Sequence, residues 1–544
     1  MFSILPQPTK ANARSGRLKL VLPLTMTGGP GTQASLQYLE LLLGDHARLV
    51  PEPPALLRLD LDGSLAGELG DEGYALDVTP GGIHIRAPWS AGLFYGLQSL
   101  RQLLPADAAA LPPGQVLDLP CLSIRDRPCY PWRGFMLDEA RHFFGVATVK
   151  RVLDWMACLK LNRFHWHLTD DQGWRVEIQQ YPLLTEVGGR RAGTQVGSFL
   201  PRRAQIDPTP YEGWYTQRQI HELVDYAAAR HITIVPEIDL PGHFSAALAA
   251  YPHLGCSAGA TAEAHAARVR RRWGIFEDVA CVGNPQTVAF MRDVLNEVCQ
   301  LFPGRHIHLG GDEVKTVHWQ ACPHCRRIKR RYGYGSWADL TTHTMNVLAV
   351  HLRRRDKTAV VWNEALRSSL SKDVVVMHWR PGWRSMGRTK QALRDGYQVV
   401  FQTWLESYFD YPHTIVPLRS VYRARTFEDV EPAMAQNVLG VQGALWTEFV
   451  ADEARIQFNV FPRLAAKAEV GWSGPPSRAD YARRYPDFQQ RWQALLPHLE
   501  GMGLAHAASL AVSDPRPARQ AWDLLRDLRR GDLQAEERRW EAGN

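Results

Sequence analysis

Two acids stand side by side after a pair of glycines, in the segment Gly310-Gly311-Asp312-Glu313. A carboxyl group that releases and recovers a proton suits general acid–base catalysis, and the cleavage of a glycosidic bond needs such a donor at the leaving oxygen. Glycines before the acids leave room for a substrate to approach the backbone. Neighbouring residues at a strand end point in different directions, so we expect Asp312 and Glu313 to have different tasks. A salt-bridged strand end is the structural alternative.

Acids, histidines and tryptophans also follow most other apolar runs between residues 130 and 450. A single residue of this kind could be explained by packing in the core, and Trp362 and Trp379 could be core residues without a role in a site. His165 and His167 alternate onto one face, where we expect buried, hydrogen-bonded rings. Repetition on nearly every run predicts one shared site, because the carboxyl ends of barrel strands converge. The other residues are Asp138, Arg141, His142, Asp170, Asp171, Glu237, Asp239, His243, Asn363, Glu364, His378, Tyr408, Asp410, Trp446, Thr447 and Glu448.

Short apolar or β-branched runs alternate with helical patterns over this region, which is typical of an α/β protein. Eight such alternations predict a (β/α)₈ TIM barrel. A doubly wound open sheet would need a glycine-rich phosphate turn after its first strand, and the sequence has none there. Thr216 to Gln219 fits a capping box at the head of a helix. The predicted strands are 134–137, 163–168, 232–238, 306–309, 359–362, 374–379, 398–401 and 439–446; predicted helices include 146–159, 220–230 and 288–302.

Residues 1–125 form a separate predicted unit. Tyr74–Thr79 and Ile83–Arg86 alternate like a strand hairpin, and Ser90 to Leu104 follows with helical spacing. This pattern predicts a small α+β domain, and the proline-rich stretch from Leu111 to Pro120 is expected to mark its end. Residues 126–475 would then be the barrel. Residues 476–544 are predicted to be a helical C-terminal extension, with a charged helix at 524–540.

The composition is that of an ordinary globular protein, with 544 residues, 45% hydrophobic content and a net charge of +7. Basic runs at 270–272 and 326–331 carry few aromatic residues, so we interpret them as solvated helix faces and expect no nucleic acid partner. The start of the sequence shows no signal peptide, and no apolar run is long enough for a membrane span. We expect a cytoplasmic protein without a membrane partner, or a secreted one if a leader was removed.

The eight cysteines are scattered, except in Cys322-Pro323-His324-Cys325. A single C-x-x-C segment is compatible with half of a zinc site, a disulfide or chance. A structural zinc ion needs four ligands, and the nearest other pair, Cys256 and Cys281, is loosely spaced. We therefore expect neither a metal site nor a cofactor.

The chain resembles family 20 of the glycoside hydrolases, the β-N-acetylhexosaminidase group, from about residue 5 to about 475. The first unit also resembles the small α+β domain that precedes the barrel in that family. The motifs that carry the resemblance are RGFMLDEARHFF (133–144), FHWHLTDDQGWR (164–175), PEIDLPGH (236–243), HLGGDEV (308–314), VVWNEA (360–365) and GALWTEF (443–449).

The resemblance implies a retaining exo-enzyme that removes terminal GlcNAc or GalNAc from a glycan. In this scheme the substrate's 2-acetamido oxygen attacks the anomeric carbon and gives an oxazoline, while Glu313 acts as the general acid. Asp312 would orient the acetamido group and Tyr408 would donate to its oxygen. The remaining implied roles are an aromatic box (Trp362, Trp379, Trp446), contacts to ring hydroxyls (Arg141, Asp410, Glu448) and orientation of the acid (His243, with Asp170 or Asp171 and Asp239). Trp404 to Glu406 could take the register assigned to Tyr408 and Asp410.

Two other functions remain open at this stage. The H-x-H pair at His165 and His167 suits a metal-dependent amidohydrolase or deacetylase, although that class wants the pair at the end of the first strand. A non-catalytic glycan-binding protein on the same scaffold is the second alternative, and the retained acids speak against it. The expected partner in either glycan case is an oligosaccharide with a terminal N-acetylhexosamine. The sequence leaves open whether the chain is a homo-oligomer.

Overall fold

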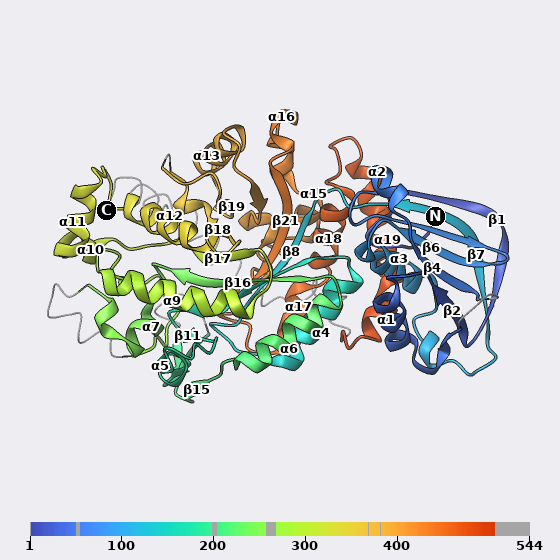
Figure 1. Ribbon diagram of the computed structural model, residues 1–544, viewed down its shortest axis with the longest axis horizontal. Helices are drawn as coiled ribbons and strands as arrows, with labels where there is room; N and C mark the ends of the chain where they lie inside the picture. Colours follow the sequence, from blue (N-terminus) through green and yellow to red (C-terminus); the bar gives the residue numbers. More distant parts are fainter. Residues whose placement is uncertain are drawn as a thin grey trace.

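Eight parallel strands close into a barrel in the computed structural model, which describes residues 2–50, 55–197, 204–256, 268–367, 369–380 and 382–505. The strands follow chain order around the barrel, and the last pairs with the first (Figure 1). The predicted (β/α)₈ barrel is confirmed, and each predicted run matches one strand to within two residues at each end. The strands are β8 (Trp132–Asp138), β9 (Arg163–His167), β16 (Thr233–Leu240), β17 (His306–Gly310), β18 (Thr358–Trp362), β19 (Val375–His378), β20 (Val399–Phe401) and β21 (Val438–Leu445).

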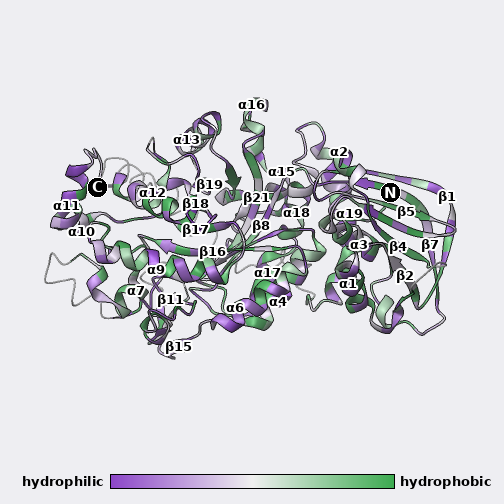
Figure 2. Cartoon of the chain, in the orientation of Figure 1, coloured by the Kyte–Doolittle hydropathy of each residue, from purple (hydrophilic) through white to green (hydrophobic). Residues whose placement is uncertain are grey.

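Burial on both faces explains why these strands read as apolar runs. Every residue of β8 and β19 is buried, and so are nearly all residues of the other barrel strands. Parallel strands covered by helices need apolar side chains on both sides. Figure 2 shows hydrophobic stretches in barrel strands such as β19 and hydrophilic patches on α11 (Pro323–Arg331). The polar residues at the strand ends therefore stand out as exceptions.

The helices around the barrel agree with the predicted ranges. They include α4 (Val146–Cys158), α6 (Gln217–Ala228), α9 (Pro285–Leu301) and α12 (Asp339–Arg353). The capping box is present at the start of α6, where Thr216 accepts from the backbone of Gln219 and Gln219 accepts from the backbone of Thr216. No helix among the described residues is both long and apolar enough to cross a membrane.

A mixed seven-stranded sheet forms the first domain, in the order β1-β7-β5-β6-β4-β2-β3. The predicted hairpin is β5 (Tyr74–Thr79) with β6 (Gly82–Ala87), and the predicted helix is α3 (Ser90–Leu103). Pro120 does not mark the domain's end, because it lies inside β7 and the β5–β7 ladder begins only at Leu122. The remaining strands are β1 (Lys10–Val21), β2 (Leu24–Gly28), β3 (Ala47–Leu49), β4 (Leu57–Leu61) and β7 (Val116–Asp126).

Helix α3 lies between this sheet and the barrel (Figure 1). Tyr95 on α3 packs edge-on against Trp472 of α18 (Arg463–Ser473), with ring centroids 5.1 Å apart. A buried ion pair joins Lys160, just after α4, to Asp126 at the end of β7, at 3.3 Å. A buried charge without its partner is strongly destabilising, so this pair ties the two domains in one arrangement.

The C-terminal extension begins with α19 (Tyr481–Glu500), which packs against the barrel. Arg491 forms a buried ion pair with Glu469 of α18 at 2.7 Å, and Trp492 stacks on Phe461. The charged helix predicted at 524–540 lies outside the described residues.

Four cysteines from two separate segments meet in the fold. Cys256 and Cys281 lie with Cys322 and Cys325, and one sulfur atom from each lies within 4.8 Å of all the others. The expectation that loose spacing separates these pairs is wrong, because the segments after β16 and β17 come together at the same end of the barrel.

Candidate active site

The carboxyl end of β17 carries the two acids. Gly310 and Gly311 have φ angles of 69° and 95°, in the left-handed region that favours glycine. A Cβ at Gly310 would lie 1.7 Å from Oδ1 of Asp239 on β16, so no larger residue fits there. Glu313 also has a positive φ, of 51°, which costs a residue with a side chain ~1–2 kcal/mol. Strain of this kind is concentrated at functional sites.

This strained backbone changes where the acids point. Asp312 Oδ2 lies 3.9 Å and Glu313 Oε2 lies 3.5 Å from the same atom, Nε2 of His243. The prediction that the two side chains point in different directions is therefore wrong. Strand alternation holds only within a strand, and the chain has left β17 at Gly310. The acids still differ in exposure, since the side chain of Asp312 is 10% exposed and that of Glu313 is 29% exposed.

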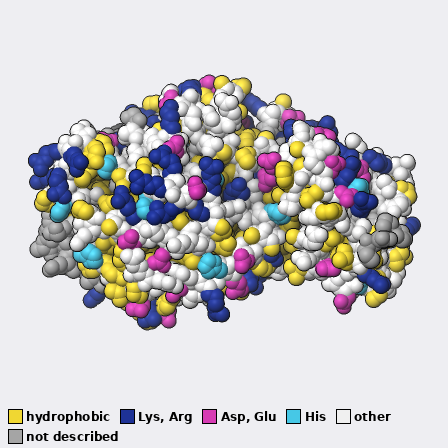
Figure 3. Space-filling model, in the orientation of Figure 1, with side chains coloured by type: hydrophobic (Ala, Val, Ile, Leu, Met, Phe, Trp, Pro, Cys, Tyr) yellow, Lys and Arg dark blue, Asp and Glu magenta, His cyan; other side chains and the backbone are white. Residues whose placement is uncertain are grey.

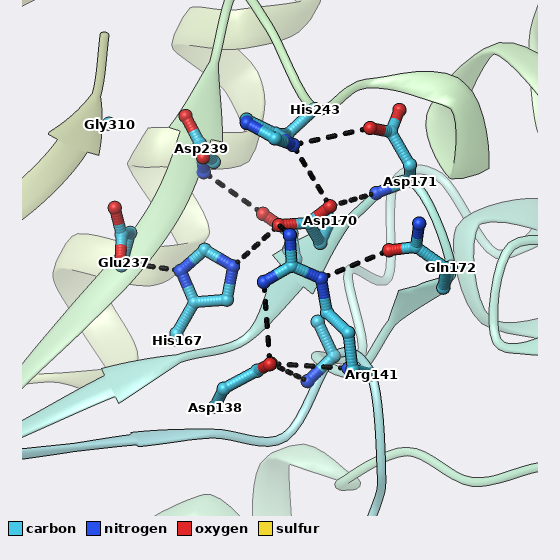
Figure 4. Close-up of polar contacts among 12 residues, drawn as sticks. Asp138, Arg141, His167, Asp170, Asp171, Gln172, Glu237, Asp239, His243 and Gly310 are labelled. Carbon is cyan, nitrogen blue, oxygen red and sulfur yellow. Dashed lines mark hydrogen bonds and ion pairs between the residues drawn. The ribbon is translucent and has the colours of Figure 1, made fainter. Parts of the chain in front are cut away.

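A series of charged side chains leads from Arg141 through Asp170 to His243 (Figure 4). Arg141 forms an ion pair of 2.7 Å with Oδ2 of Asp170. The other oxygen of Asp170 lies 3.1 Å from Nδ1 of His243, and Asp171 lies 3.2 Å from the same nitrogen. Since Nε2 of this ring faces the acids, His243 bridges the carboxylates after β9 and those after β17.

Charge around His243 keeps its ring protonated. Burial opposes protonation, but the negative charge of Asp170 and the hydrogen bonds to Asp170 and Asp171 outweigh it and raise the pKa of His243 well above its usual value. Burial raises the pKa of Asp312 well above its usual value; the His243 cation opposes this rise, and the charge of Glu313 adds to it. The acids therefore share an imidazolium neighbour at neutral pH.

The predicted buried histidines form a network around Glu237. His165, His167 and His308 each place a ring nitrogen within 3.0 Å of its carboxylate. His167 also lies 2.9 Å from Asp170, so the network supports the series that reaches Arg141. Some of these groups lie close enough for a metal ion, but hydrogen bonds and ion pairs account for their arrangement. The structural interpretation of His165 and His167 agrees with their complete burial.

Glu364 is a functional candidate that the sequence analysis placed among the strand-end residues but gave no role. It follows β18, and its Oε2 accepts a 3.1 Å hydrogen bond from the backbone N–H of Glu313. Arg380 lies 3.5 Å from the same oxygen. Burial raises the pKa of Glu364 to about 7, with Arg380 opposing the rise and the charge of Glu313 adding to it. Its position at a strand end, in Trp362-Asn363-Glu364, was the available signal.

Four aromatic rings gather near one another at this end of the barrel, and three of them are the tryptophans predicted to form the aromatic box. Trp379 stacks on Tyr408 at 6.1 Å, and Trp446 lies 6.2 Å from Tyr408 and 6.3 Å from Trp362, between ring centroids. Trp362 is almost fully buried and donates to Glu237 at 2.8 Å, so it is also a core residue. Burial raises the pKa of Tyr408, and its hydroxyl remains a donor at neutral pH.

Several buried polar atoms near these rings have no hydrogen-bond partner among the described residues. They include Oδ1 of Asp312, Nε1 of Trp379 and Oδ1 of Asp410. A buried polar atom without a partner is costly, and such atoms call for a specific explanation. A polar substrate that reaches these three atoms would supply their partners.

The register after β20 is resolved by the side chains. Glu406 accepts from the backbone and hydroxyl of Thr426, whereas Tyr408 joins the aromatic rings. Trp404 packs at the edge of the same cluster. The structure thus brings Tyr408, rather than Glu406, to the candidate site.

Arg141 and Glu448, which are both expected to contact ring hydroxyls of the substrate, lie close enough for their charges to interact. Arg141 makes its ion pairs with Asp138 and Asp170 and lies over the ring of Trp446, at 5.1 Å. Glu448 acts on Arg141 through its charge. Burial and the charge of Glu448 raise the pKa of Asp410 well above its usual value.

The basic run 270–272 is not a helix face, which corrects the sequence interpretation. It is irregular backbone that packs on the candidate site, because the N–H of Arg270 donates to the carbonyl of Asp171 and the carbonyl of Arg272 accepts from Gln172. The run 326–331 does lie on α11, where most of its side chains are exposed.

Two family descriptions match the chain. Residues 130–475 match "Glycosyl hydrolase family 20, catalytic domain", and residues 1–127 match "Glycosyl hydrolase family 20, domain 2". The chain is 36% identical over 452 residues to a β-hexosaminidase of Porphyromonas gingivalis, a match that covers 80% of this chain and 54% of that one. It is 33% identical over 494 residues to a β-hexosaminidase of Akkermansia muciniphila, covering 86% and 94%. The chain therefore spans about half the length of the first relative and nearly all of the second.

Solved structures give the same picture. An exo β-N-acetylglucosaminidase from Vibrio harveyi, in complex with N-acetylglucosamine, aligns with a TM-score of 0.79 and 29% identity, over 92% of this chain and 78% of that one. A mutant β-hexosaminidase from Streptomyces plicatus, in complex with its product GlcNAc, aligns with a TM-score of 0.77 and 30% identity, over 92% and 96%.

Proposed function

Because the chain belongs to glycosyl hydrolase family 20, the β-N-acetylhexosaminidase group, and is thus a glycoside hydrolase, we propose that it removes terminal, non-reducing GlcNAc or GalNAc from glycans. We propose further that the reaction retains the anomeric configuration and proceeds through an oxazoline formed by the substrate's own acetamido group. The family relationship favours this chemistry over that of a metal-dependent amidohydrolase.

The placement of Asp312 and Glu313 is the observation that carries the mechanism. A retaining glycosidase with a protein nucleophile needs its two carboxyl groups on opposite sides of the scissile bond, ~5 Å apart. Here the two carboxylates belong to adjacent residues at the end of one strand, and both lie within 4 Å of the same nitrogen of His243, so we infer that they act together on one side of the scissile bond. When one acid protonates the leaving group, the other is not placed to attack the anomeric carbon from the opposite side. In this proposal the substrate's own acetamido oxygen is the nucleophile instead.

Asp312 suits the stabilisation of an oxazolinium ion. Its Oδ1 is buried and has no hydrogen-bond partner among the residues that the structure describes, and burial holds its pKa high. An acetamido N–H would give that oxygen a hydrogen bond and so orient the group. Positive charge that develops on the acetamido nitrogen favours the ionised carboxylate, so the interaction strengthens as the transition state is approached.

Glu313 is the proposed general acid, and later the base that activates water. It is the more exposed of the two acids, and its backbone is fixed by the hydrogen bond to Glu364. General acid–base help of this kind is typically worth ~10²–10⁴ in rate. His243 orients the carboxylate and is a positioning residue in this scheme.

The aromatic rings and the outer polar groups would hold the sugar. Trp362, Trp379 and Trp446 would surround the acetamido methyl, while the hydroxyl of Tyr408 would donate to its oxygen. Flat apolar rings suit the C–H faces of a pyranose, and charge-assisted hydrogen bonds suit its hydroxyls. The proposed hydroxyl contacts are Arg141, Asp410 and Glu448.

A panel of chromogenic glycosides tests the proposal. We expect hydrolysis of the GlcNAc and GalNAc β-glycosides, no useful hydrolysis of the β-glucoside, and inhibition by a thiazoline mimic of the oxazoline. The anomer that forms first, followed by NMR, should be β. Good glucoside turnover or indifference to the thiazoline would contradict the assisted mechanism. Binding without release of sugar would favour the glycan-binding alternative.

A further inference from the structure

We propose that Cys256, Cys281, Cys322 and Cys325 form a structural zinc site, which pins the segment after β16 to the segment after β17. The inference goes beyond the glycosidase activity and does not depend on it. These cysteines are the only group of four metal-ligating side chains in close mutual contact within the part of the chain that the structure describes.

The distances between the sulfur atoms fit a tetrahedral ion. Sγ of Cys281 lies 3.6 Å from Sγ of Cys322 and 3.8 Å from Sγ of Cys325, and Cys256 lies 3.9 Å from Cys325. Zinc–sulfur bonds of ~2.3 Å in a tetrahedron place neighbouring sulfurs about 3.8 Å apart. A disulfide would need sulfurs at ~2.0 Å, well inside these distances.

The surroundings are those of a closed structural site. Cys322 and Cys325 are fully buried, Cys281 is 2% exposed and Cys256 is 9% exposed. Structural zinc sites use four protein ligands and leave no open position, whereas catalytic ones keep one for water or substrate. The apolar side chains that enclose the sulfurs are Val279, Val282, Val314, Trp319 and Leu340.

The backbone is arranged to bring the two segments together. A Cβ at Gly283 would lie 2.3 Å from the carbonyl carbon of His324 and 2.4 Å from the nitrogen of Cys325, so this contact requires glycine. The N–H of Cys281 donates to the carbonyl of Leu254 at 2.8 Å, which places Cys256 beside it. Two loops of unrelated sequence thus present their cysteines to one point.

Charge around the cluster also favours thiolates. Cys322 is the N-cap of α11 and Cys325 lies in its first turn, where the helix dipole is positive. A zinc ion with four thiolates carries two net negative charges, and the rest of α11 is strongly basic. Figure 3 shows Lys and Arg side chains gathered at this end of the molecule. Four thiolates in a tetrahedron suit zinc or iron. Iron would serve electron transfer, which glycoside hydrolysis does not need, so we assign zinc.

The position of the site suggests what it stabilises. Val314 follows the acid Glu313 directly and packs in the cysteine cluster. On the other segment, the N–H of Ala280 donates to the carbonyl of Pro241, close to His243. The ion would therefore hold together the two segments that carry His243 and the acids.

Metal analysis of the untagged full chain, purified without chelators, tests the assignment. We expect about one zinc ion per chain, which a thiol-directed organomercurial releases. In a separate sample without the mercurial, all eight cysteines should react with a thiol reagent in denaturant without reductant. Absence of zinc with eight free thiols, absence of zinc with fewer thiols because of disulfides, or iron in its place would each overturn the proposal.

Variants locate the ion. Cys281→Ser and Cys325→Ser should lose most of the zinc, while Cys299→Ser, a partly buried cysteine outside the cluster, should keep it. Retention of a full equivalent by both cluster variants would place the zinc elsewhere and contradict us. Since the variants could fail to fold, wild-type protein grown with cobalt gives an independent measurement. Four thiolates around Co²⁺ predict intense sulfur-to-metal charge-transfer bands, and a spectrum without them would also overturn the site.

Discussion

Nε2 of His243 lies 3.5 Å from Oε2 of Glu313, and both residues hold a left-handed backbone, with φ of 48° and 51°. A left-handed backbone is sterically unfavourable for a residue with a side chain. The fold keeps both because the contact joins the carboxylates after β9 to the acid after β17. The orientation of Glu313 thus depends on a cation whose own partners lie on another strand.

Replacement of His243 by Asn should lower kcat/KM roughly 10²-fold, as expected when a reacting group loses its alignment. Asn adopts a left-handed backbone more readily than most residues, so the change removes the ring and its charge with little added strain. His231 has a φ of 55° in the link between α6 and β16, and His231→Asn serves as the matched control with activity near that of wild type. Steady-state kinetics of both variants decide the point; a drop of less than twofold at His243 would refute its role.

Replacement of Glu313 by Gln should lower turnover of a natural disaccharide by ~10²–10⁴, because the leaving oxygen loses its proton donor. An aryl glycoside with a good leaving group needs less protonation and should lose less. The thiazoline inhibitor should still bind, since the groups around the acetamido site are unchanged. Near-normal disaccharide turnover by this variant would remove Glu313 from the mechanism.

Replacement of Gly310 by Ala should destabilise the protein by about 3 kcal/mol, the sum of left-handed strain and overpacking. The added methyl group would meet the carboxylate of Asp239 and displace the acids that follow. Gly333→Ala is the matched control, because Gly333 has a similar φ, 65° against 69°, with nothing within 4 Å of its added Cβ. It should cost about 1 kcal/mol and leave activity intact. Denaturant unfolding of both variants measures the difference; equal losses would contradict the packing argument.

Replacement of Glu364 by Gln should change the pH dependence of stability. Burial raises the pKa of Glu364 to about 7 in the folded protein, from an ordinary value of 4.5. The folded state therefore keeps a proton that the unfolded chain releases, so this group's contribution is complete below pH 4.5 and is lost as the pH rises to about 7. The total is about 3 kcal/mol.

The Gln variant keeps a hydrogen-bond acceptor for the N–H of Glu313 but has no titration. Its stability relative to wild type should rise between pH 4.5 and 7 and stay constant above that range. Denaturant unfolding of both proteins at three pH values measures this difference. A difference that does not vary with pH would show that Glu364 titrates normally.

Much of the barrel could be predicted because its strands are buried on both faces and read as apolar runs. The strand β1 could not, since its first eight residues are all exposed and no pattern marks them. Strand β7 was not predicted because Pro120 was interpreted as part of a domain boundary. Pro120 lies outside the part of β7 that pairs with β5, so it does not interrupt the β5–β7 ladder. Most members of the candidate site could be predicted, because they are acids, histidines or tryptophans that directly follow an apolar strand.

Side-chain directions and contacts between distant segments were beyond the sequence. The left-handed backbone at Glu313 turns its side chain toward His243, and strand alternation predicted otherwise. The hydrogen bond from Glu313 to Glu364 joins residues that follow two different strands, β17 and β18. The cysteine cluster shows the same limit, because spacing along the chain says little about two loops that the barrel brings together.

The central claim is that the substrate's acetamido oxygen is the nucleophile. Aryl N-acylglucosaminides with acetyl, fluoroacetyl, difluoroacetyl and trifluoroacetyl groups test it most directly, because each fluorine makes that oxygen less nucleophilic at small cost in size. We predict that kcat/KM falls at every step, by ~10² or more overall, which corresponds to about 2.7 kcal/mol in activation free energy. A kcat/KM that stays constant along the series would contradict the assisted mechanism.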